Sequence, residues 1–160
     1  MVDVSELKRI EMFNVFSDNQ LEKLAKITEK QTYGVHSHVY EHGDRAKYLF
    51  VVCKGLVSLR ELKPEDQIGI AFEMRERGEC FGAACFMKPQ QYTLTGVCLE
   101  DSEVFAIDAE KLLDLCEADA ELGYKLMKKV AGLYFDRYKA AKRQLFEMVK
   151  APTLVTALPG

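Results

Sequence analysis

The residues best suited to hold a ligand lie in one stretch from Gly78 to Asp108, which reads GECFGAACFMKPQQYTLTGVCLEDSEVFAID. We predict that it folds as a strand, a glycine turn, a short helix, a loop and two strands. The segment 82–87 is too rich in small residues for a strand, and Pro89 ends the helix because proline disfavours helical geometry in the residue before it. A glycine that opens a helix leaves backbone N–H groups free, so this helix start is a candidate anion-binding site.

Two histidines offer a different chemistry, that of a metal site. His36 and His38 would share one face of a strand, and Glu41 and His42 follow closely. This alternative is a cupin-like metal site at His36 and His38. The glutamate spacing does not fit, however, and no histidine follows residue 42. We therefore favour polar histidines at a strand end and predict no metal.

The sequence shows no nucleophile beside a base and no pair of catalytic carboxylates, so we predict that the protein is not an enzyme. Its five cysteines form neither a C-x-x-C motif nor a four-ligand spacing, which argues against zinc fingers and iron–sulfur clusters. We interpret most of them as small hydrophobic residues, and a redox pair within the stretch 78–108 stays an open alternative. The cysteines are Cys53, Cys80, Cys85, Cys98 and Cys116.

The composition is that of one soluble globular domain. The chain has 160 residues, of which 48% are hydrophobic and 29% are charged, enough for a sizeable core. Its net charge of −3 argues against nucleic acid as the main partner. No apolar run is long enough to span a membrane and no secretory leader is present, so we expect a cytoplasmic protein without a membrane partner.

The elements that position the candidate site begin with a helical lead-in over residues 4–29. Apolar residues recur at helical spacing in residues 4–13, and Ser17 and Gln20 form a capping box for a second helix. From about residue 30 to 108 the apolar period is two, and glycines separate short strands. Residues 47–53 predict a buried strand, and the alternation from Ile68 to Met74 predicts a half-buried one. This pattern favours a mainly β fold, a jelly-roll-like double-stranded β-helix with flanking helices.

At this point the chain resembles a known family. The order F-G, short helix, loop and V-x-L-E-D-S-E-V-x-A-I-D looks like the phosphate-binding cassette of cyclic nucleotide-binding domains. These are the sensor domains of catabolite-activator-type regulators, cyclic-nucleotide-dependent kinases and gated channels. The lead-in MFNVFSDNQLEKLAKI and the pattern Y-G-x-H…G-D…Y-L-F-V-V-x-x-G are similar to the same family, over about residues 5–148.

The cassette departs from the family at two positions. Where the family has a glutamate that binds the ribose, this chain has Ala83, and where the family has an arginine that clamps the cyclic phosphate, it has Tyr92. Thr93 matches the serine, threonine or alanine that follows the arginine in the family. An arginine gives charge-assisted bonds worth roughly 1.5–3 kcal/mol each, whereas tyrosine offers at most one neutral bond. We expect cAMP and cGMP to bind weakly or not at all. Two alternatives remain for the pocket. It binds a small anion or a planar ligand stacked on Tyr92, or the Tyr92 side chain itself fills it.

A long helix with two apolar faces is predicted after Asp119. The stripe of Leu122, Leu126, Val130 and Leu133 suits packing on the β domain. The other face keeps a spacing of three and four residues, which is typical of a helix that pairs with a second copy in a parallel two-fold dimer. The alternative is a helix folded only on its own domain. The predicted seam comprises Tyr124, Met127, Ala131, Tyr134, Tyr138, Ala141, Leu145 and Met148.

In catabolite-activator-type regulators this helix leads into a DNA-binding domain. Here only APTLVTALPG follows, which we predict to be a flexible tail at residues 151–160, so no direct DNA binding is expected. We predict one cyclic nucleotide-binding-like domain at residues 1–150, with a lead-in at 4–29, a β-roll at 30–108 and C-terminal helices at 109–150.

The sequence therefore predicts a dimeric, non-catalytic module that senses a small ligand. A cyclic nucleotide or another small anionic ligand is the candidate ligand, and a separate effector protein is a candidate partner. The alternative is a degenerate domain that serves only as a dimeric interaction scaffold. The predicted ligand-binding residues are Phe81, Gly82, Ala83, Ala84, Cys85, Tyr92, Thr93, Tyr134 and Tyr138.

Overall fold

The computed structural model describes residues 1–62 and 69–149. The predicted tail at 151–160, the predicted loop after Leu62 and Ile68 lie outside the described residues. None of the helices within the described part of the chain is both long and apolar enough to cross a membrane.

The N-terminal lead-in folds as three short helical pieces, α1 (Val4–Leu7), η1 (Glu11–Val15) and α2 (Asp18–Lys26). The predicted capping box is confirmed, because Gln20 N donates to Ser17 Oγ at 3.3 Å and Ser17 N donates to Gln20 Oε1 at 3.1 Å. The helical spacing predicted one helix over residues 4–13, but α1 ends at Leu7 and the 3-10 helix η1 follows it. It places Met12 and Phe13 in the core, and Phe13 packs edge-on against Phe105 of the sheet.

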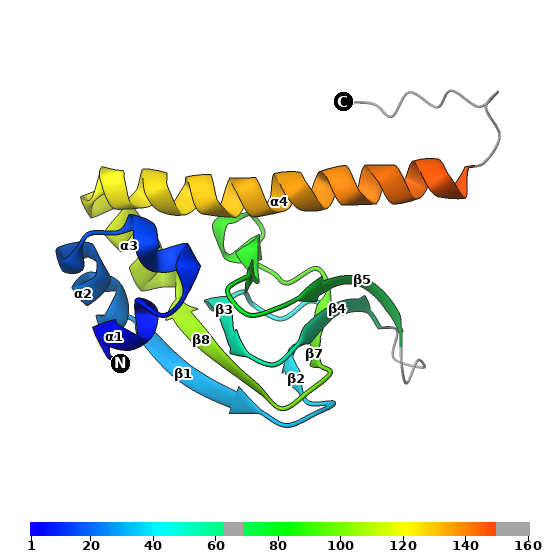
Figure 1. Cartoon of the computed structure of the whole chain (residues 1–160), viewed down its shortest axis with the longest axis horizontal. Coiled ribbons are helices and arrows are strands. Elements are labelled where there is room, and N and C mark those ends of the chain that lie inside the picture. Colours follow the sequence, from blue (N-terminus) through cyan, green and yellow to red (C-terminus); the bar gives the residue numbers. More distant parts are fainter. Residues whose placement is uncertain (63–68, 150–160) are drawn as a thin grey trace.

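Two antiparallel four-stranded sheets form the predicted β-roll, with strand orders β1-β8-β3-β6 and β2-β7-β4-β5 (Figure 1). In β3 four consecutive side chains from Leu49 to Val52 are buried, since one face of the strand lies in the roll and helices cover the other. The strands are β1 (Thr28–Tyr33), β2 (His38–Tyr40), β3 (Tyr48–Lys54), β4 (Val57–Glu61), β5 (Ile70–Arg75), β6 (Cys80–Phe81), β7 (Thr95–Cys98) and β8 (Ser102–Asp108).

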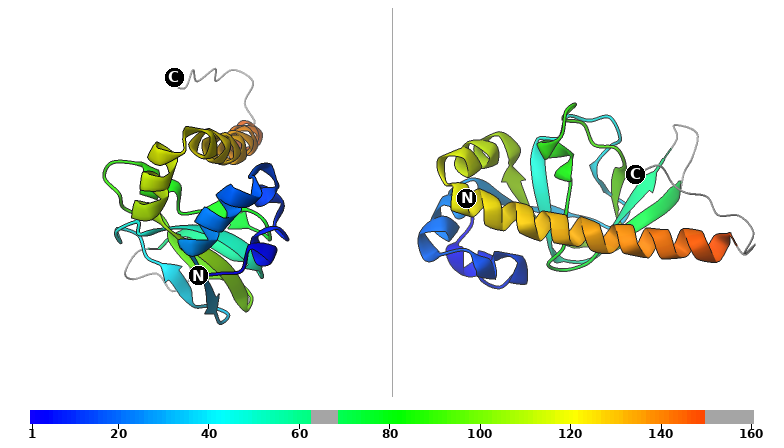
Figure 2. Two further views of the ribbon diagram at one scale, coloured as in Figure 1. Left: turned by 90° about the vertical axis from the view of Figure 1, so that its left-hand side faces the viewer. Right: turned by 90° about the horizontal axis from the view of Figure 1, so that it is seen from above.

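The C-terminal helices are α3 (Ala109–Ala118) and α4 (Ala120–Met148), and α4 crosses the whole β-roll (Figures 1 and 2). Asp119 caps α4, since its carboxylate accepts from Leu122 N at 3.0 Å. Gly123 allows the two helices to meet closely, because a Cβ there would lie 3.1 Å from the carbonyl oxygen of Cys116. The close contact between α3 and α4 at Gly123 fixes the direction in which α4 leaves α3.

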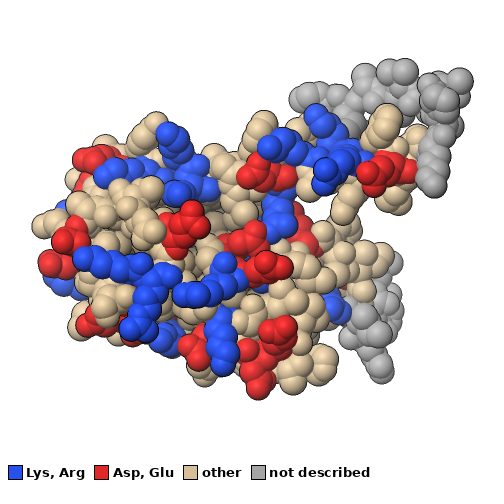
Figure 3. All heavy atoms as spheres, viewed as in Figure 1, with Lys and Arg blue, Asp and Glu red and all other residues tan. Residues whose placement is uncertain are grey.

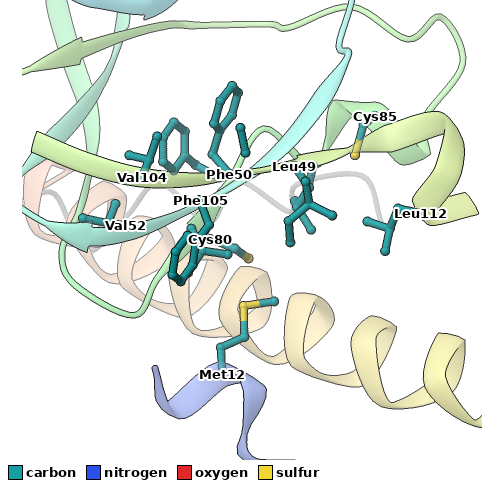
Figure 4. Close-up of a cluster of buried hydrophobic side chains, with 14 of the residues drawn as sticks. Met12, Leu49, Phe50, Val52, Cys80, Cys85, Val104, Phe105 and Leu112 are labelled. Atoms are coloured by element: carbon teal, nitrogen blue, oxygen red, sulfur yellow. The ribbon is translucent and has the colours of Figure 1, made fainter. Parts of the chain in front are cut away.

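The core lies between the sheet that contains β3 and the helices around it. Side chains from η1 (Met12), β3 (Leu49, Val52) and α3 (Leu112) belong to one buried cluster, part of which is shown in Figure 4. The predicted inner stripe of α4 is confirmed, as Leu122, Leu126 and Val130 are buried and Leu133 packs on the cluster. The first half of α4 is therefore part of the domain's core.

Candidate functional site

The cassette turn has the predicted order of a strand, a glycine and a short helix. Gly82 follows β6 with a φ of 80° and precedes the 3-10 helix η2 (Ala83–Phe86). A side chain at Gly82 would be strained because L-residues rarely adopt this positive φ. It would also be crowded, since its Cβ would lie 3.1 Å from the carbonyl oxygen of Tyr48 and 3.2 Å from the Tyr92 ring. Glycine thus lets the Tyr92 ring pack directly on the turn.

Tyr92 lies inside the roll rather than at its surface. Only 4% of the residue is exposed, and its ring stacks on Tyr40 with centroids 3.7 Å apart and an interplanar angle of 16°. Its hydroxyl donates to the carbonyl oxygen of Tyr48 at 2.8 Å and accepts from Tyr48 N at 3.2 Å. Burial raises the pKa of the Tyr92 phenol above its ordinary value, so the side chain is neutral. Of the two alternatives for Tyr92, this geometry favours the side chain that fills the pocket.

A cavity of about 460 Å³ opens beside Tyr92, between the cassette turn, β4, β5 and α4. The charged residues that line it, among those the structure describes, are Glu61 and Glu73. Six of the predicted ligand-binding residues line it, namely Gly82, Ala83, Ala84, Tyr92, Thr93 and Tyr134. Phe81 and Cys85 are buried beside the turn, and Tyr138 lies on α4 outside the described lining.

Sequence reasoning missed the opposite wall of this cavity. The prediction of a half-buried strand here was wrong, because Ile70, Phe72 and Met74 of β5 are exposed at 68%, 59% and 40% and the buried side chain is Arg75. Phe72 and Glu73 of this strand line the cavity beside the cassette. The lining residues that were not predicted are Tyr40, Leu59, Glu61, Phe72, Glu73 and Leu94. This wall is apolar and aromatic with two carboxylates, of which Glu73 is paired with Arg75, and among the described lining residues it offers no Lys or Arg side chain to a phosphate.

Arg75 is a second residue that sequence reasoning missed, and none of its surface is exposed. Its Nε donates to the carbonyl oxygen of Cys80 at 3.0 Å, its Nη1 to that of Met74 at 3.1 Å, and its Nη2 to the Glu73 carboxylate. The guanidinium carbon also lies 5.8 Å from the centroid of the Tyr134 ring. Arg75 thus connects the acidic wall of the cavity to α4.

Replacing Arg75 with methionine should lower the free energy of unfolding by about 2 kcal/mol, because the buried carbonyl of Cys80 loses its charged donor. Urea unfolding followed by circular dichroism measures this change. The matched control is Arg77→Met, two residues further on, where the side chain is exposed and we expect less than about 0.5 kcal/mol. Equal losses in the two variants would contradict the role given to Arg75.

All eight predicted seam residues of α4 are exposed in the single chain. The exposed fractions reach 66% for Tyr124, 56% for Tyr138 and 81% for Met148. Figure 3 shows clusters of basic side chains along α4, with a few acidic ones between them. The face is therefore apolar and extended, and it is exposed to solvent even where Tyr134 also contacts Arg75.

The alternative metal site is not supported by the backbone. His38 begins β2, but His36 lies in the turn before it with a φ of 66°, so the two do not share a strand face. His38 Nδ1 instead lies 3.3 Å from Glu41 Oε1. Within residues 1–62 and 69–149 no three side chains of the metal-binding types come together.

The cysteines of the described residues are free thiols in or beside the core. Burial raises the pKa of the Cys80 thiol to about 11 and that of Cys85 to about 12. Because the thiolate is the reactive form, these two groups are poorly suited to redox chemistry at neutral pH.

The model of the family described as cyclic nucleotide-binding domain matches residues 30–119, which include the cassette turn and all eight strands except the first two residues of β1. No curated protein matches the chain.

Several solved structures share the fold at low sequence identity. One, described as a cyclic nucleotide-binding protein from Geobacter metallireducens, superposes with a TM-score of 0.75 at 24% identity, over 86% of this chain and 99% of that one. The sensor domain of the transcriptional regulator DNR from Pseudomonas aeruginosa gives 0.67 at 19% identity, over 96% and 95%. The catabolite activator protein of Thermus thermophilus gives 0.66 at 20% identity, over 86% and 62%.

Proposed function

Because the chain belongs to the cyclic nucleotide-binding domain family, we propose that it is a dimeric, non-catalytic module that senses a small ligand other than cAMP or cGMP. The observation that carries this proposal is the position of Tyr92. Its ring is buried against Tyr40, where the cassette resemblance places the arginine that clamps a cyclic phosphate. The site thus keeps the family's scaffold without its charged contact.

The surroundings of Tyr92 support the exclusion of a cyclic nucleotide. A bound phosphate would meet the Glu61 carboxylate in the lining, and Arg75 behind the wall is already paired with Glu73. Ala83 has no side chain that could hold a ribose hydroxyl. Thr93 and the tyrosines of the wall remain as neutral polar contacts. A ligand of this module is therefore recognised by shape and aromatic contact more than by a phosphate clamp.

The dimer is proposed to form through the seam of α4. Its support is the exposure of an apolar face that keeps heptad spacing from Tyr124 to Met148, since a soluble helix rarely leaves such a face uncovered. In a parallel two-fold pair each seam residue would meet its own copy. We propose that residues 1–150 act as one unit, whose helices respond to ligand and present a surface to an effector protein.

The second candidate function is a dimeric scaffold without a ligand. It is favoured by the same burial of Tyr92, because a side chain that fills a site also closes it. A screen for ligands that raise the melting temperature distinguishes the two functions, since any ligand that binds only the folded state stabilises it.

Isothermal titration of the purified protein with cAMP or cGMP should give no binding tighter than about 100 μM. The reason is the loss of at least one bidentate charged contact, which is roughly 3 kcal/mol or about a hundredfold in affinity. The double variant Ala83→Glu with Tyr92→Arg restores both family side chains and should gain affinity. Sub-micromolar binding by the unmodified protein would refute this part of the proposal.

A further inference from the structure

A second cavity of about 650 Å³ lies outside the roll, between the segment that follows η2 and the middle of α4. Phe86, Met87 and Pro89 form its side on the loop, and Met127, Val130 and Ala131 form its side on the helix. Its volume is that of a site for a small organic molecule. No part of the proposed function assigns it a ligand.

The two cavities share one wall but differ in the charged residues that line them. Ala83, Ala84, Tyr92, Thr93 and Tyr134 line both. The inner cavity adds two carboxylates to this wall. The outer cavity adds one lysine, Lys88, and the neutral polar side chains of His42 and Gln91 to a lining that is mostly apolar.

Lys88 is the charged group available to a ligand in the outer cavity. Its side chain is exposed at the rim, and no acceptor among the residues that the structure describes forms a hydrogen bond or ion pair with it. His42, Gln91 and Thr93 add polar groups along the same rim. An anionic group at this rim would meet a free cation, while an apolar body would contact Phe86, Met87 and Met127.

We propose that the outer cavity binds an apolar organic acid, with its carboxylate or sulfonate at Lys88 and its body between the loop and α4. Such a ligand is complementary to the cavity, because its anionic group would pair with the Lys88 ammonium and its apolar body would contact the apolar side chains. A cyclic nucleotide does not fit this description, because its polar sugar would face the methionines.

Binding here reaches the seam directly. Met127, Ala131 and Tyr134 belong to both the cavity lining and the seam. If the proposed dimer forms, which is the part that rests on the proposed function, a ligand in the outer cavity lies against the partner's helix. The site itself needs no dimer, so the two claims are tested separately.

The probe is 8-anilinonaphthalene-1-sulfonate, an apolar acid whose fluorescence rises on burial, titrated beside the uncharged N-phenyl-1-naphthylamine. Lys88→Gln should weaken the sulfonate about tenfold and leave the uncharged probe within twofold, as expected for one charge-assisted contact. The matched control is Lys26→Gln on α2, which removes an exposed lysine far along the chain and should change neither probe. Ala131→Phe fills the cavity and should abolish saturable binding of both.

Three results would overturn the proposal. They are the absence of saturable binding at one site per chain, equal affinity of the sulfonate for the Lys88 and Lys26 variants, and binding that survives Ala131→Phe. The titration is repeated on Tyr138→Glu with Leu145→Glu, in which the proposed dimer is broken. Binding that appears only in this variant would mean that the partner's helix, not a small molecule, occupies the cavity.

Discussion

Replacing Tyr92 with alanine should lower the free energy of unfolding by about 3–5 kcal/mol. The residue is 4% exposed, stacks on Tyr40 and packs on the backbone of Gly82, so its loss leaves an aromatic-sized hole in the roll. Two backbone groups of Tyr48 also lose the hydroxyl that pairs with them. Urea unfolding monitored by circular dichroism gives the difference.

Two controls separate the parts of this effect. Tyr92→Phe keeps the ring and removes the hydroxyl, and should cost about 1–2 kcal/mol. Tyr124→Ala truncates a tyrosine that is 66% exposed on α4 and should cost less than about 1 kcal/mol. If Tyr92→Ala were as mild as Tyr124→Ala while ligand binding was lost, Tyr92 would be a contact for a ligand rather than a filler of the pocket.

Replacing Tyr138 and Leu145 together with glutamate should convert the proposed dimer to monomers. Both side chains are exposed in the single chain, with fractions of 56% and 43%, so the fold should tolerate the change. In a two-fold seam the pair of substitutions places four carboxylates at the interface. The lost burial alone is worth about 4 kcal/mol or more, which raises the dissociation constant at least about a thousandfold. Light scattering over a range of concentrations measures the mass.

The control pair is Phe135→Glu with Phe146→Glu. These phenylalanines are exposed at 61% and 80% on the same helix, but they lie about 100° further round it than the seam. The control pair should leave the mass unchanged. Dimers that survive the first pair, or are lost only with the second, would place the contact on another face of α4.

The parts of the fold that follow a simple period could be predicted from the sequence. Ser17 and Gln20 mark a helix start through local hydrogen bonds, and the alternating and buried strands define a roll without any knowledge of long-range contacts. The cassette turn was predictable because Gly82 can adopt the positive φ of the turn and Pro89 disfavours helical geometry in the residue before it. The inner stripe of α4 also follows from spacing alone.

The rest of the site depends on contacts between distant segments. Arg75 appears in the sequence as a charged end of a strand, and only the approach of α4 and Cys80 makes it a buried residue. The acidic wall of Glu61 and Glu73 required the pairing of β4 with β5 and their position opposite the cassette. The helical spacing of residues 4–13 did not show that the helix ends at Leu7 and that a separate 3-10 helix, η1, begins at Glu11.

The two arginine contacts of α4 have a mechanical consequence. In the first, Arg75 of β5 lies against the ring of Tyr134 on α4. In the second, Arg137 of α4, about one turn further along, forms an ion pair with Glu79 of the β-roll. These two contacts hold the helix at this point. Beyond it α4 continues for about 16 Å of helix, from Arg137 to Met148, and its end extends past β5 (Figure 1). A tilt of about 10° at the held turn would displace the free end by ~3 Å, given the 1.5 Å rise per residue. Such a tilt would make the end of α4 a lever arm, with its pivot at Tyr134, which lines both cavities.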